Sequence, residues 1–368
     1  MQNHLLKSLA ISNSFACLML GKFMLLIAWD WASGTQYFGS YALANGLVAG
    51  VMVIASLQAR MLVMAHIRNR ADFLNLRKLL LVLGVACGGL VLLLNWGFPM
   101  FILLALIIGQ RVLENLVLAQ ASFEQVSSNR EKAYGRINIA GFAIFAVYVI
   151  APIWSLELAL MLELVCLTLL VFWQNRSLPP KTDRAVFNGK DLFQIGLGFS
   201  LSAGMNAGLN SMLLYFCYQY FGQDMALMLA QILAIQAVIA RVMASNSLYF
   251  VTAVSTWLSL NAGFILLLWA ALLSGLLGVF SLTLSIISLA VFFTLINILN
   301  ILLRQNLIAR FGPKRLLGLH AAELLCFGAL AIVATGGVML FAIFTVIRAF
   351  RIPVLIRMRQ LEDQEALA

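Results

Sequence analysis

Charged residues are scarce in this chain. Of its 368 residues only 10% are Asp, Glu, Lys or Arg, whereas 63% are hydrophobic, and only six are prolines. A helix that crosses a membrane needs roughly 20 consecutive apolar residues, and about twelve such runs fit into this length. Little polar sequence is left over for a soluble domain. The composition therefore excludes a soluble globular protein and indicates an all-α integral membrane protein.

Motifs for metals and cofactors are also missing. The five cysteines lie far apart inside apolar runs, with no CxxC spacing and no histidine pattern beside them, so we interpret them as packing residues. We expect neither a metal nor a cofactor. The net charge of +10 is spread along the chain instead of being gathered in one domain, which argues against a nucleic-acid partner. Membrane lipids are the expected surroundings.

The apolar runs predict twelve transmembrane helices in two groups of six. The first run is longer than the core of a signal peptide and no small-residue cleavage site follows it, so we interpret it as a retained span. The spans are expected near residues 8–29, 37–57, 79–94, 100–120, 134–151, 156–173, 192–216, 223–243, 257–277, 281–303, 316–334 and 336–356. We predict an amino-terminal bundle at 1–175, a basic cytoplasmic linker at 176–190 and a carboxy-terminal bundle at 191–368.

The positive charges gather on one side of these predicted spans. Apart from Lys22 and Arg111, all lysines and arginines, 22 of the 24, lie on the side of the amino terminus, and none lies in the six opposite loops. Loops with an excess of Lys and Arg stay in the cytoplasm. The distribution predicts a multi-pass protein of the cell inner membrane with both termini in the cytoplasm.

A short sequence recurs half a chain apart. Tyr37-Phe38-Gly39 returns as Tyr220-Phe221-Gly222, 183 residues later, and we expect each copy to open the second span of its half. Repeats at such spacing are typical of membrane proteins that are built from two like-oriented bundles.

The turn after the first span resembles that of a known family, the O-antigen flippases of the multidrug, oligosaccharidyl-lipid and polysaccharide (MOP) exporter superfamily. The resemblance rests on the turn QYFGSYALA, on the basic loop after the second span and on the central basic linker. It implies two six-helix pseudo-repeat bundles around a central cavity. It also implies that the protein moves an undecaprenyl-diphosphate-linked oligosaccharide from the inner to the outer leaflet, with polysaccharide-assembly proteins as further partners.

Two positive charges are expected at membrane depth, Lys22 in the first span and Arg111 in the fourth. A charge there costs at least about 2.5–3.5 kcal/mol, so each residue is a candidate for function. Both suit a diphosphate, and Arg can hold two of its oxygens at once. The alternatives are that Lys22 extends to the interface toward Asp30, and that Arg111 pairs with Glu114 on the same helix face.

Three carboxylates are also expected inside the spans: Glu114, Glu163 and Glu323, the last one turn after His320. Burial disfavours the charged form of a carboxylate, which is the property that a proton- or sodium-coupled exporter uses. All three are therefore candidates for ion coupling. The alternatives are pairing with a cation and a position at the inner interface.

The seventh span combines glycines with amides. Gly204 and Gly208 have the GxxxG spacing of closely packed helices. Asn206 and Asn210, four residues apart, share a helix face and are candidates for binding sugar hydroxyls. Further amides of the same kind are Asn45, Gln231, Gln236, Asn297 and Asn300. Amides inside a membrane also hydrogen-bond helices to one another.

Other classes of protein compete with a flippase. A major-facilitator transporter would carry a glycine-bearing motif after the second span, and the loop ARMLVMAHIRNRADFLNLRK has no glycine. An ion-coupled multidrug exporter of the same superfamily stays open and would depend on the deep carboxylates. A membrane-embedded polysaccharide polymerase or acyltransferase is less favoured, because the short outer loops carry no histidine and only Asp30, Glu157 and Asp224 as acids. The sequence predicts a transporter and not an enzyme.

Overall fold

The computed structural model is helical throughout the part of the chain that it describes. That part comprises residues 21–59, 62–63, 66–67, 69–97, 99–126, 130–176, 185–237, 289–290, 293, 296–297, 300 and 315–365. Within it lie the helices 21–33, α2 (Tyr37–Ala55), α4 (Arg70–Leu94), α5 (Phe101–Val126), α6 (Arg130–Ile150), α7 (Leu156–Asn175), α8 (Gly189–Phe221), 223–237, α11 (Arg315–Ala331) and α12 (Gly337–Glu365), with a 3₁₀ turn at Ala151–Ile153.

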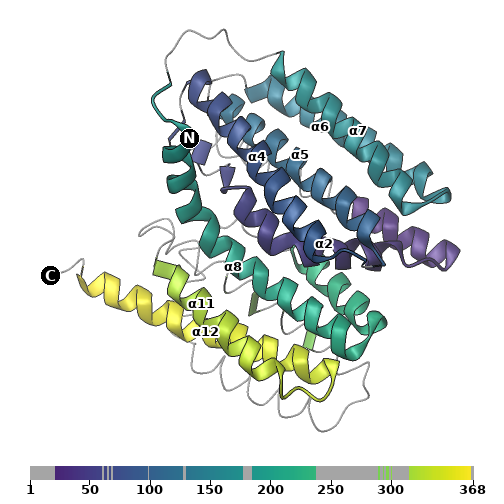
Figure 1. The fold of residues 1–368 in the computed structure, drawn as a ribbon, viewed down its shortest axis with the longest axis vertical. Helices are drawn as coiled ribbons and strands as arrows, with labels where there is room; N and C mark the ends of the chain where they lie inside the picture. Colours follow the sequence, from purple (N-terminus) through teal and green to yellow (C-terminus); the bar gives the residue numbers. More distant parts are fainter. Residues whose placement is uncertain are drawn as a thin grey trace. The chain divides into compact units, whose positions relative to one another are not determined.

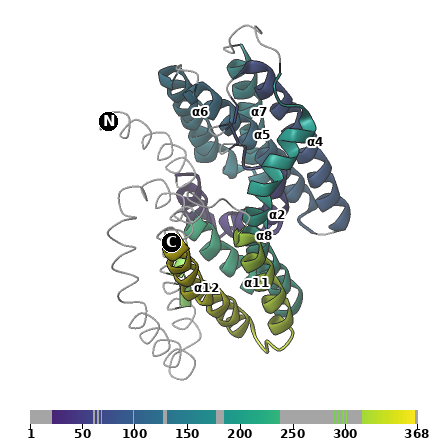
Figure 2. The same cartoon turned by 90° about the vertical axis from the view of Figure 1, so that its left-hand side faces the viewer.

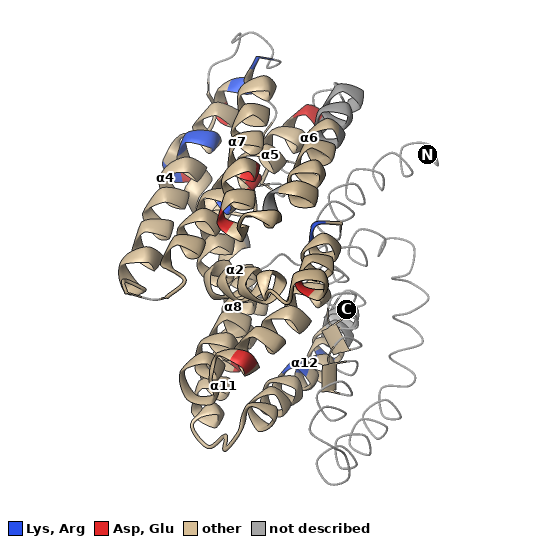
Figure 3. Cartoon of the chain, turned by 90° about the vertical axis from the view of Figure 1, so that its right-hand side faces the viewer, with Lys and Arg blue, Asp and Glu red and all other residues tan. Residues whose placement is uncertain are grey.

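Five of these helices are long and apolar enough to cross a membrane: α2, α4, α5, α7 and α12. Shorter apolar stretches lie at Ile139–Ile150 and Leu316–Ala331. The predicted ninth span and most of the tenth lie outside the described residues, so the count of twelve stays a prediction. In Figure 3 most of the ribbon of the described helices is tan, the colour of residues other than Lys, Arg, Asp and Glu, as expected of helices that lie in lipid.

One large error in the predicted boundaries is at α4, which begins at Arg70 and not near residue 79. Its first turns are too polar to count as membrane, yet Asn69 caps them by accepting a hydrogen bond of 2.8 Å from the Asp72 amide. They also bury Phe73 and Leu76. Hydropathy finds the part of a helix that lies in lipid, whereas the cap determines where the helix starts.

The chain forms two compact units. One comprises residues 14–211 and the other residues 1–13 and 212–368, so that α8 passes from the first unit into the second between Ser211 and Met212. Figures 1 and 2 show α4, α5, α6 and α7 running side by side in the first unit. There α5 contacts α2, α4, α6 and α7, and in the second unit α11 packs on α12. The predicted bounds of the bundles and of the linker stay a prediction.

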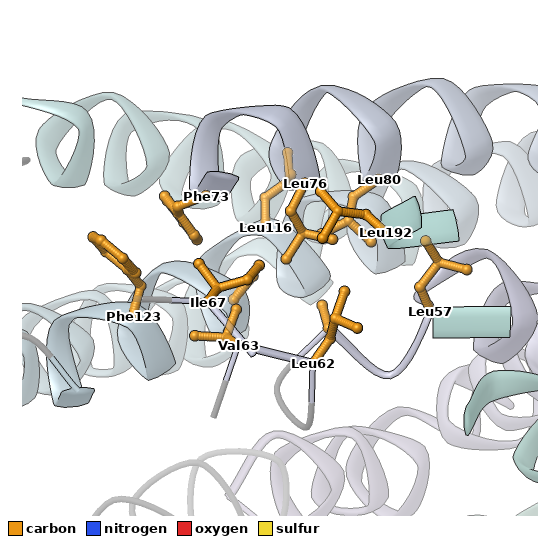
Figure 4. Close-up of a cluster of buried hydrophobic side chains, with 12 residues drawn as sticks. Leu57, Leu62, Val63, Ile67, Phe73, Leu76, Leu80, Leu116, Phe123 and Leu192 are labelled. Carbon is orange, nitrogen blue, oxygen red and sulfur yellow. The ribbon is translucent and has the colours of Figure 1, made fainter. Parts of the chain in front are cut away.

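A hydrophobic cluster in the first unit holds the start of α8 against the preceding helices (Figure 4). It combines buried side chains of α4 and α5 with the segment after α2 and with Leu192 of α8. The rings of Phe73 and Phe123 stack there with centroids 4.5 Å apart. The buried Asp72 carboxylate accepts hydrogen bonds of 2.8 Å from the amides of Val186 and Phe187. The end of the predicted linker is therefore fixed to α4.

The turn before α2 is organised by Asp30. Its carboxylate accepts hydrogen bonds from the amides of Tyr37 at 2.5 Å and of Phe38 at 3.0 Å, which are donors that the start of a helix leaves free. Tyr37 therefore opens α2 as predicted. The second copy is different, because Tyr220 and Phe221 close α8 and Gly222, at φ +91°, makes the turn. The prediction that this copy opens a span is wrong.

Gly204 of α8 and Gly50 of α2 allow the two helices to approach closely, so the close packing that the GxxxG spacing predicts is found at Gly204. A Cβ added at Gly50 would lie 2.7 Å from the Cα of Gly208, and one at Gly204 would collide with Ile54. Between the two helices, Ser211 donates a hydrogen bond of 2.6 Å to the Gly46 carbonyl.

Candidate functional site

A buried ion pair lies at the centre of the first unit. Lys22, on the first helix, places its Nζ 2.6 Å from Oε2 of Glu163 on α7, and the two side chains are 1% and 2% exposed. The Tyr148 hydroxyl, from α6, donates to the same oxygen at 2.6 Å. Two charges so deeply buried are stable only when they are paired and hydrogen-bonded, and here both conditions are met.

Two aromatic rings complete the surroundings of the lysine. Its Nζ lies 4.2 Å from the centroid of the Tyr41 ring and 4.6 Å from that of Tyr148. A cation within about 6 Å of a ring face is attracted by it, by about 2 kcal/mol when both are dehydrated. The ammonium group is therefore enclosed by one carboxylate and two tyrosines from three different helices.

Gln110 of α5 connects this pair to a second one. Its Nε2 donates to Oε1 of Glu163 at 3.1 Å and to Oε1 of Glu114 at 2.9 Å. Its side chain also contacts the Tyr41 hydroxyl at 3.3 Å. One amide thus donates to both carboxylates, each of which has a cation of its own.

The second pair is Arg111 with Glu114, at 2.8 Å between Nη1 and Oε2. The other side of the guanidinium group donates twice to one oxygen, Oδ1 of Asn45 on α2, from Nε at 2.8 Å and from Nη2 at 2.6 Å. The Arg111 side chain is 22% exposed, against 5% for Glu114. Arg111 and Asn45 are therefore the partly exposed members of this network.

The spacing on α5 explains how one helix supplies three of these groups. Residues 110 and 114 are four apart and residues 111 and 114 three apart, so all three project from one face. The network has two cations and two carboxylates and is neutral as a whole. Such networks are stable in a medium of low dielectric when each member is satisfied.

The structure decides between the alternatives for these residues. Arg111 does pair with Glu114, as one alternative predicts. The extension of Lys22 toward Asp30 is wrong, because Lys22 pairs with Glu163 and Asp30 caps α2. Both Glu114 and Glu163 have a cation as partner. Their predicted role in ion coupling and that of Arg111 in substrate binding stay predictions.

A second buried cluster lies between α11 and α12 in the other unit. Glu323 accepts from Nε of Arg351 at 2.5 Å and also from its Nη2, and Nδ1 of His320 lies 3.2 Å from the same carboxylate. Arg348 lies one turn before Arg351 and 5.2 Å from the centroid of the Phe344 ring. Glu323, one of the three carboxylates predicted for ion coupling, is thus bound bidentately by Arg351.

The sequence indicated Glu323 and His320 of this cluster but not its arginines. Arg348 and Arg351 were expected among the cytoplasmic charges, whereas both are buried, at 2% and 3% exposure, within a helix that continues to Glu365. Two arginines three residues apart in an apolar helix, with a single acid in the preceding helix, are the signal that could have found it.

The predicted sugar-binding amides have mixed surroundings. Asn206 and Asn210 are half-buried on α8. In the other unit, Asn297 donates to Gln236 at 3.4 Å and Asn300 donates to the Arg348 carbonyl at 2.9 Å. These last amides join helices, which is the alternative role that the sequence left open. Among the described residues, no three His, Cys, Asp or Glu side chains are grouped so that they could hold a metal ion.

Comparison with known proteins gives no match to a family model and no significant match to a curated protein. Solved structures do match. A MOP superfamily transporter from Pyrococcus furiosus is 12% identical, with a TM-score of 0.54 over 96% of this chain and 94% of its own. An outward-facing MATE family multidrug resistance transporter is also 12% identical, with a TM-score of 0.53 over 96% of this chain and 97% of its own. A structure named protein A is 15% identical, with a TM-score of 0.57 over 96% of this chain and 94% of its own.

These likenesses are of fold, since the identities are low. The matches extend over nearly the whole chain, which has long apolar helices as a membrane transporter does. The role of a transporter therefore stays a prediction. The chain is an all-α, multi-pass membrane protein with the fold of the MOP superfamily transporters.

Proposed function

We propose that this chain is a flippase of the MOP superfamily, which moves a polyprenyl-diphosphate-linked oligosaccharide from the inner to the outer leaflet by alternating access. The proposal places it in the cell inner membrane with both termini in the cytoplasm. One observation carries it: the guanidinium group of Arg111 is partly exposed, and two of its donors are directed at a single neutral oxygen of Asn45.

In this arrangement a phosphate group could replace Asn45 as the acceptor of the two Arg111 hydrogen bonds. Nε and Nη2 form the side of an arginine that binds two oxygens of one anion in parallel. On Asn45 both donors share one oxygen of a neutral amide. A phosphate would offer each donor an oxygen of its own and a full charge. Asn45 is therefore an acceptor that a diphosphate can replace while Glu114 keeps Nη1.

The other predicted ligands take different roles in this proposal. Lys22 is enclosed by Glu163 and two tyrosines, so we assign direct contact with the diphosphate to Arg111 alone. Asn206 and Asn210 remain candidates for the sugar, because amides hydrogen-bond hydroxyl groups. The polyprenyl chain would stay in the lipid, and enzymes that assemble polysaccharides would supply and receive the substrate.

An ion-coupled multidrug exporter is the second candidate. The buried carboxylates Glu114, Glu163 and Glu323 favour it, because such groups can take up an ion when their partners move away. In this structure each of them holds a cation of the chain itself, so coupling would require one of these pairs to open. Arg111, by contrast, is already partly exposed.

The test is leaflet transfer in proteoliposomes that contain fluorescent polyprenyl-diphosphate oligosaccharides of several glycan types, with an impermeant quencher outside. Removing Arg111 alone would leave Glu114 buried without its cation, so the variant of choice is Arg111→Ala with Glu114→Gln, which keeps the network neutral. The matched control is Lys190→Ala, which removes an exposed positive charge. Charge-assisted hydrogen bonds are worth about 1.5–3 kcal/mol, so transfer should fall about 10- to 100-fold in the double variant.

The proposal stands if the wild type and Lys190→Ala transfer the lipid and the folded double variant does not. Transfer at the wild-type rate by the double variant would remove Arg111 from the site. If the wild type transfers none of the glycans faster than empty liposomes do, the flippase assignment fails and the ion-coupled exporter takes its place.

A further inference from the structure

The surroundings of Lys22 have the composition of a binding site for an ammonium ion. A carboxylate oxygen lies 2.6 Å from the Nζ atom and two tyrosine rings lie 4.2 and 4.6 Å from it. Carboxylates and aromatic faces are the groups that proteins use to recognise organic ammonium ions. The three residues come from α2, α6 and α7, so the site is formed by the packing of helices and not by local sequence.

The carboxylate in this site has no need of an ion from outside. Oε2 of Glu163 accepts from Lys22 and Tyr148, and its Oε1 accepts from Gln110. The charge of Glu163 is balanced by Lys22 within a network that is neutral as a whole. A sodium ion or an organic cation could enter only if the lysine left, which would expose its own charge to a medium of low dielectric.

We propose that Tyr41, Tyr148 and Glu163 form a binding site for a primary ammonium ion, which this chain fills with its own Lys22, so that Glu163 takes up no sodium ion or organic cation during transport. The inference does not rest on the identity of the substrate. It removes Glu163 from the candidates for coupling to these ions, and it holds for a flippase and for a drug exporter alike.

The first test restores the missing cation from solution. Lys22→Ala keeps Cβ and removes three methylenes with the ammonium group, which is the shape of n-propylammonium. A ligand that binds only the folded state raises its melting temperature. We expect n-propylammonium chloride to raise the Tm of the purified variant in detergent by about 2–4 °C, whereas sodium chloride at the same concentration and 1-propanol do not. The wild type, whose site is filled, should show no such difference.

The second test uses a double variant and applies even if Lys22→Ala does not fold. Replacing both members of a buried ion pair by neutral side chains of similar size is often harmless, whereas replacing one member is not. Lys22→Met with Glu163→Gln should therefore fold, with a Tm near that of the wild type and no response to sodium or propylammonium.

Either of two results would overturn the proposal. One is an equal rise in the Tm of Lys22→Ala with sodium chloride and with n-propylammonium. The other is a double variant that fails to recover the wild-type Tm, because Glu163 would then be needed for more than balancing Lys22. Both results come from Tm alone, so they are independent of whether the flippase assay succeeds.

Discussion

Glu323 is a buried carboxylate that contacts two basic residues, Arg351 and His320. From residue 225 to residue 361 it is the only acidic residue of the sequence, and it lies against Arg351 and His320 while Arg348 is buried nearby. The cluster thus has more positive than negative groups. The consequences of removing its acid and its base should therefore differ.

We expect Glu323→Gln to destabilise the protein more than Arg351→Met. The first variant removes the carboxylate that binds Arg351 bidentately while Arg348 stays buried nearby, whereas the second leaves Glu323 with His320 and Arg348. Breaking a buried pair costs about 3–5 kcal/mol, so Glu323→Gln should lower the Tm by many degrees. Thermal unfolding of both variants in detergent measures this. An equal decrease in Tm for the two variants, or a greater decrease for Arg351→Met, would show that the excess of positive groups in this cluster does not affect stability.

The close approach of α2 and α8 gives a prediction about two glycines that face the same crossing. A Cβ at Gly50 would lie 2.7 Å from the Cα of Gly208 and 3.0 Å from its nitrogen, whereas a Cβ at Gly208 would meet no atom within 4 Å. Both residues lie inside helices, where Gly→Ala gains about 1 kcal/mol. Gly208→Ala should keep or raise the Tm. Gly50→Ala should lower it, because overpacking costs about 1–3 kcal/mol. The opposite order would contradict the packing described for this crossing.

The start of α8 is fixed to α4 by Asp72. Its carboxylate accepts from the amides of Val186 and Phe187, and the side chain of Asn75 donates to the Phe187 carbonyl at 3.2 Å. Amides that are hydrogen-bonded in a stable unit exchange slowly with solvent. In Asp72→Ala the exchange of the Val186 and Phe187 amides should accelerate. Hydrogen exchange resolved by mass spectrometry measures this, and amides in α7 serve as the internal control. Unchanged exchange at 186 and 187 would mean that Asp72 does not hold this segment.

At the scale of the whole molecule, the distribution of lysine and arginine predicts the orientation in the membrane. Ser33, at the end of the helix 21–33, and Thr335, in the loop between α11 and α12, are exposed on the predicted outer side, and Asn188 lies in an exposed segment on the predicted inner side. In a variant without the five native cysteines, an impermeant thiol reagent applied to intact cells should label Ser33→Cys and Thr335→Cys. It should label Asn188→Cys only after the membrane is permeabilised. Labelling of Asn188→Cys in intact cells would reverse the orientation.

The positions of the membrane helices could be predicted from the sequence to a large extent. The bounds of α2, α5, α7 and α11 lie close to those that hydropathy predicts, because a helix in lipid must be apolar over the whole thickness of the hydrocarbon. The predicted helix boundaries were less accurate where a helix extends beyond the hydrocarbon of the membrane. The polar first turns of α4 depend on the cap by Asn69, and α12 continues to Glu365, beyond its apolar part.

The sequence by itself also indicated the candidate functional residues, since a charge in an apolar run is costly. Lys22, Arg111, Glu114, Glu163 and Glu323 were all identifiable in this way. Among their partners, only Glu114, three residues after Arg111 on the same helix, could be predicted from the sequence. Glu163 lies 141 residues after Lys22, and Glu323 and Arg351 lie on different helices. For these two pairs the packing of the helices decided which opposite charges meet, because in a medium of low dielectric each charge is satisfied by whatever group the fold brings within hydrogen-bonding distance.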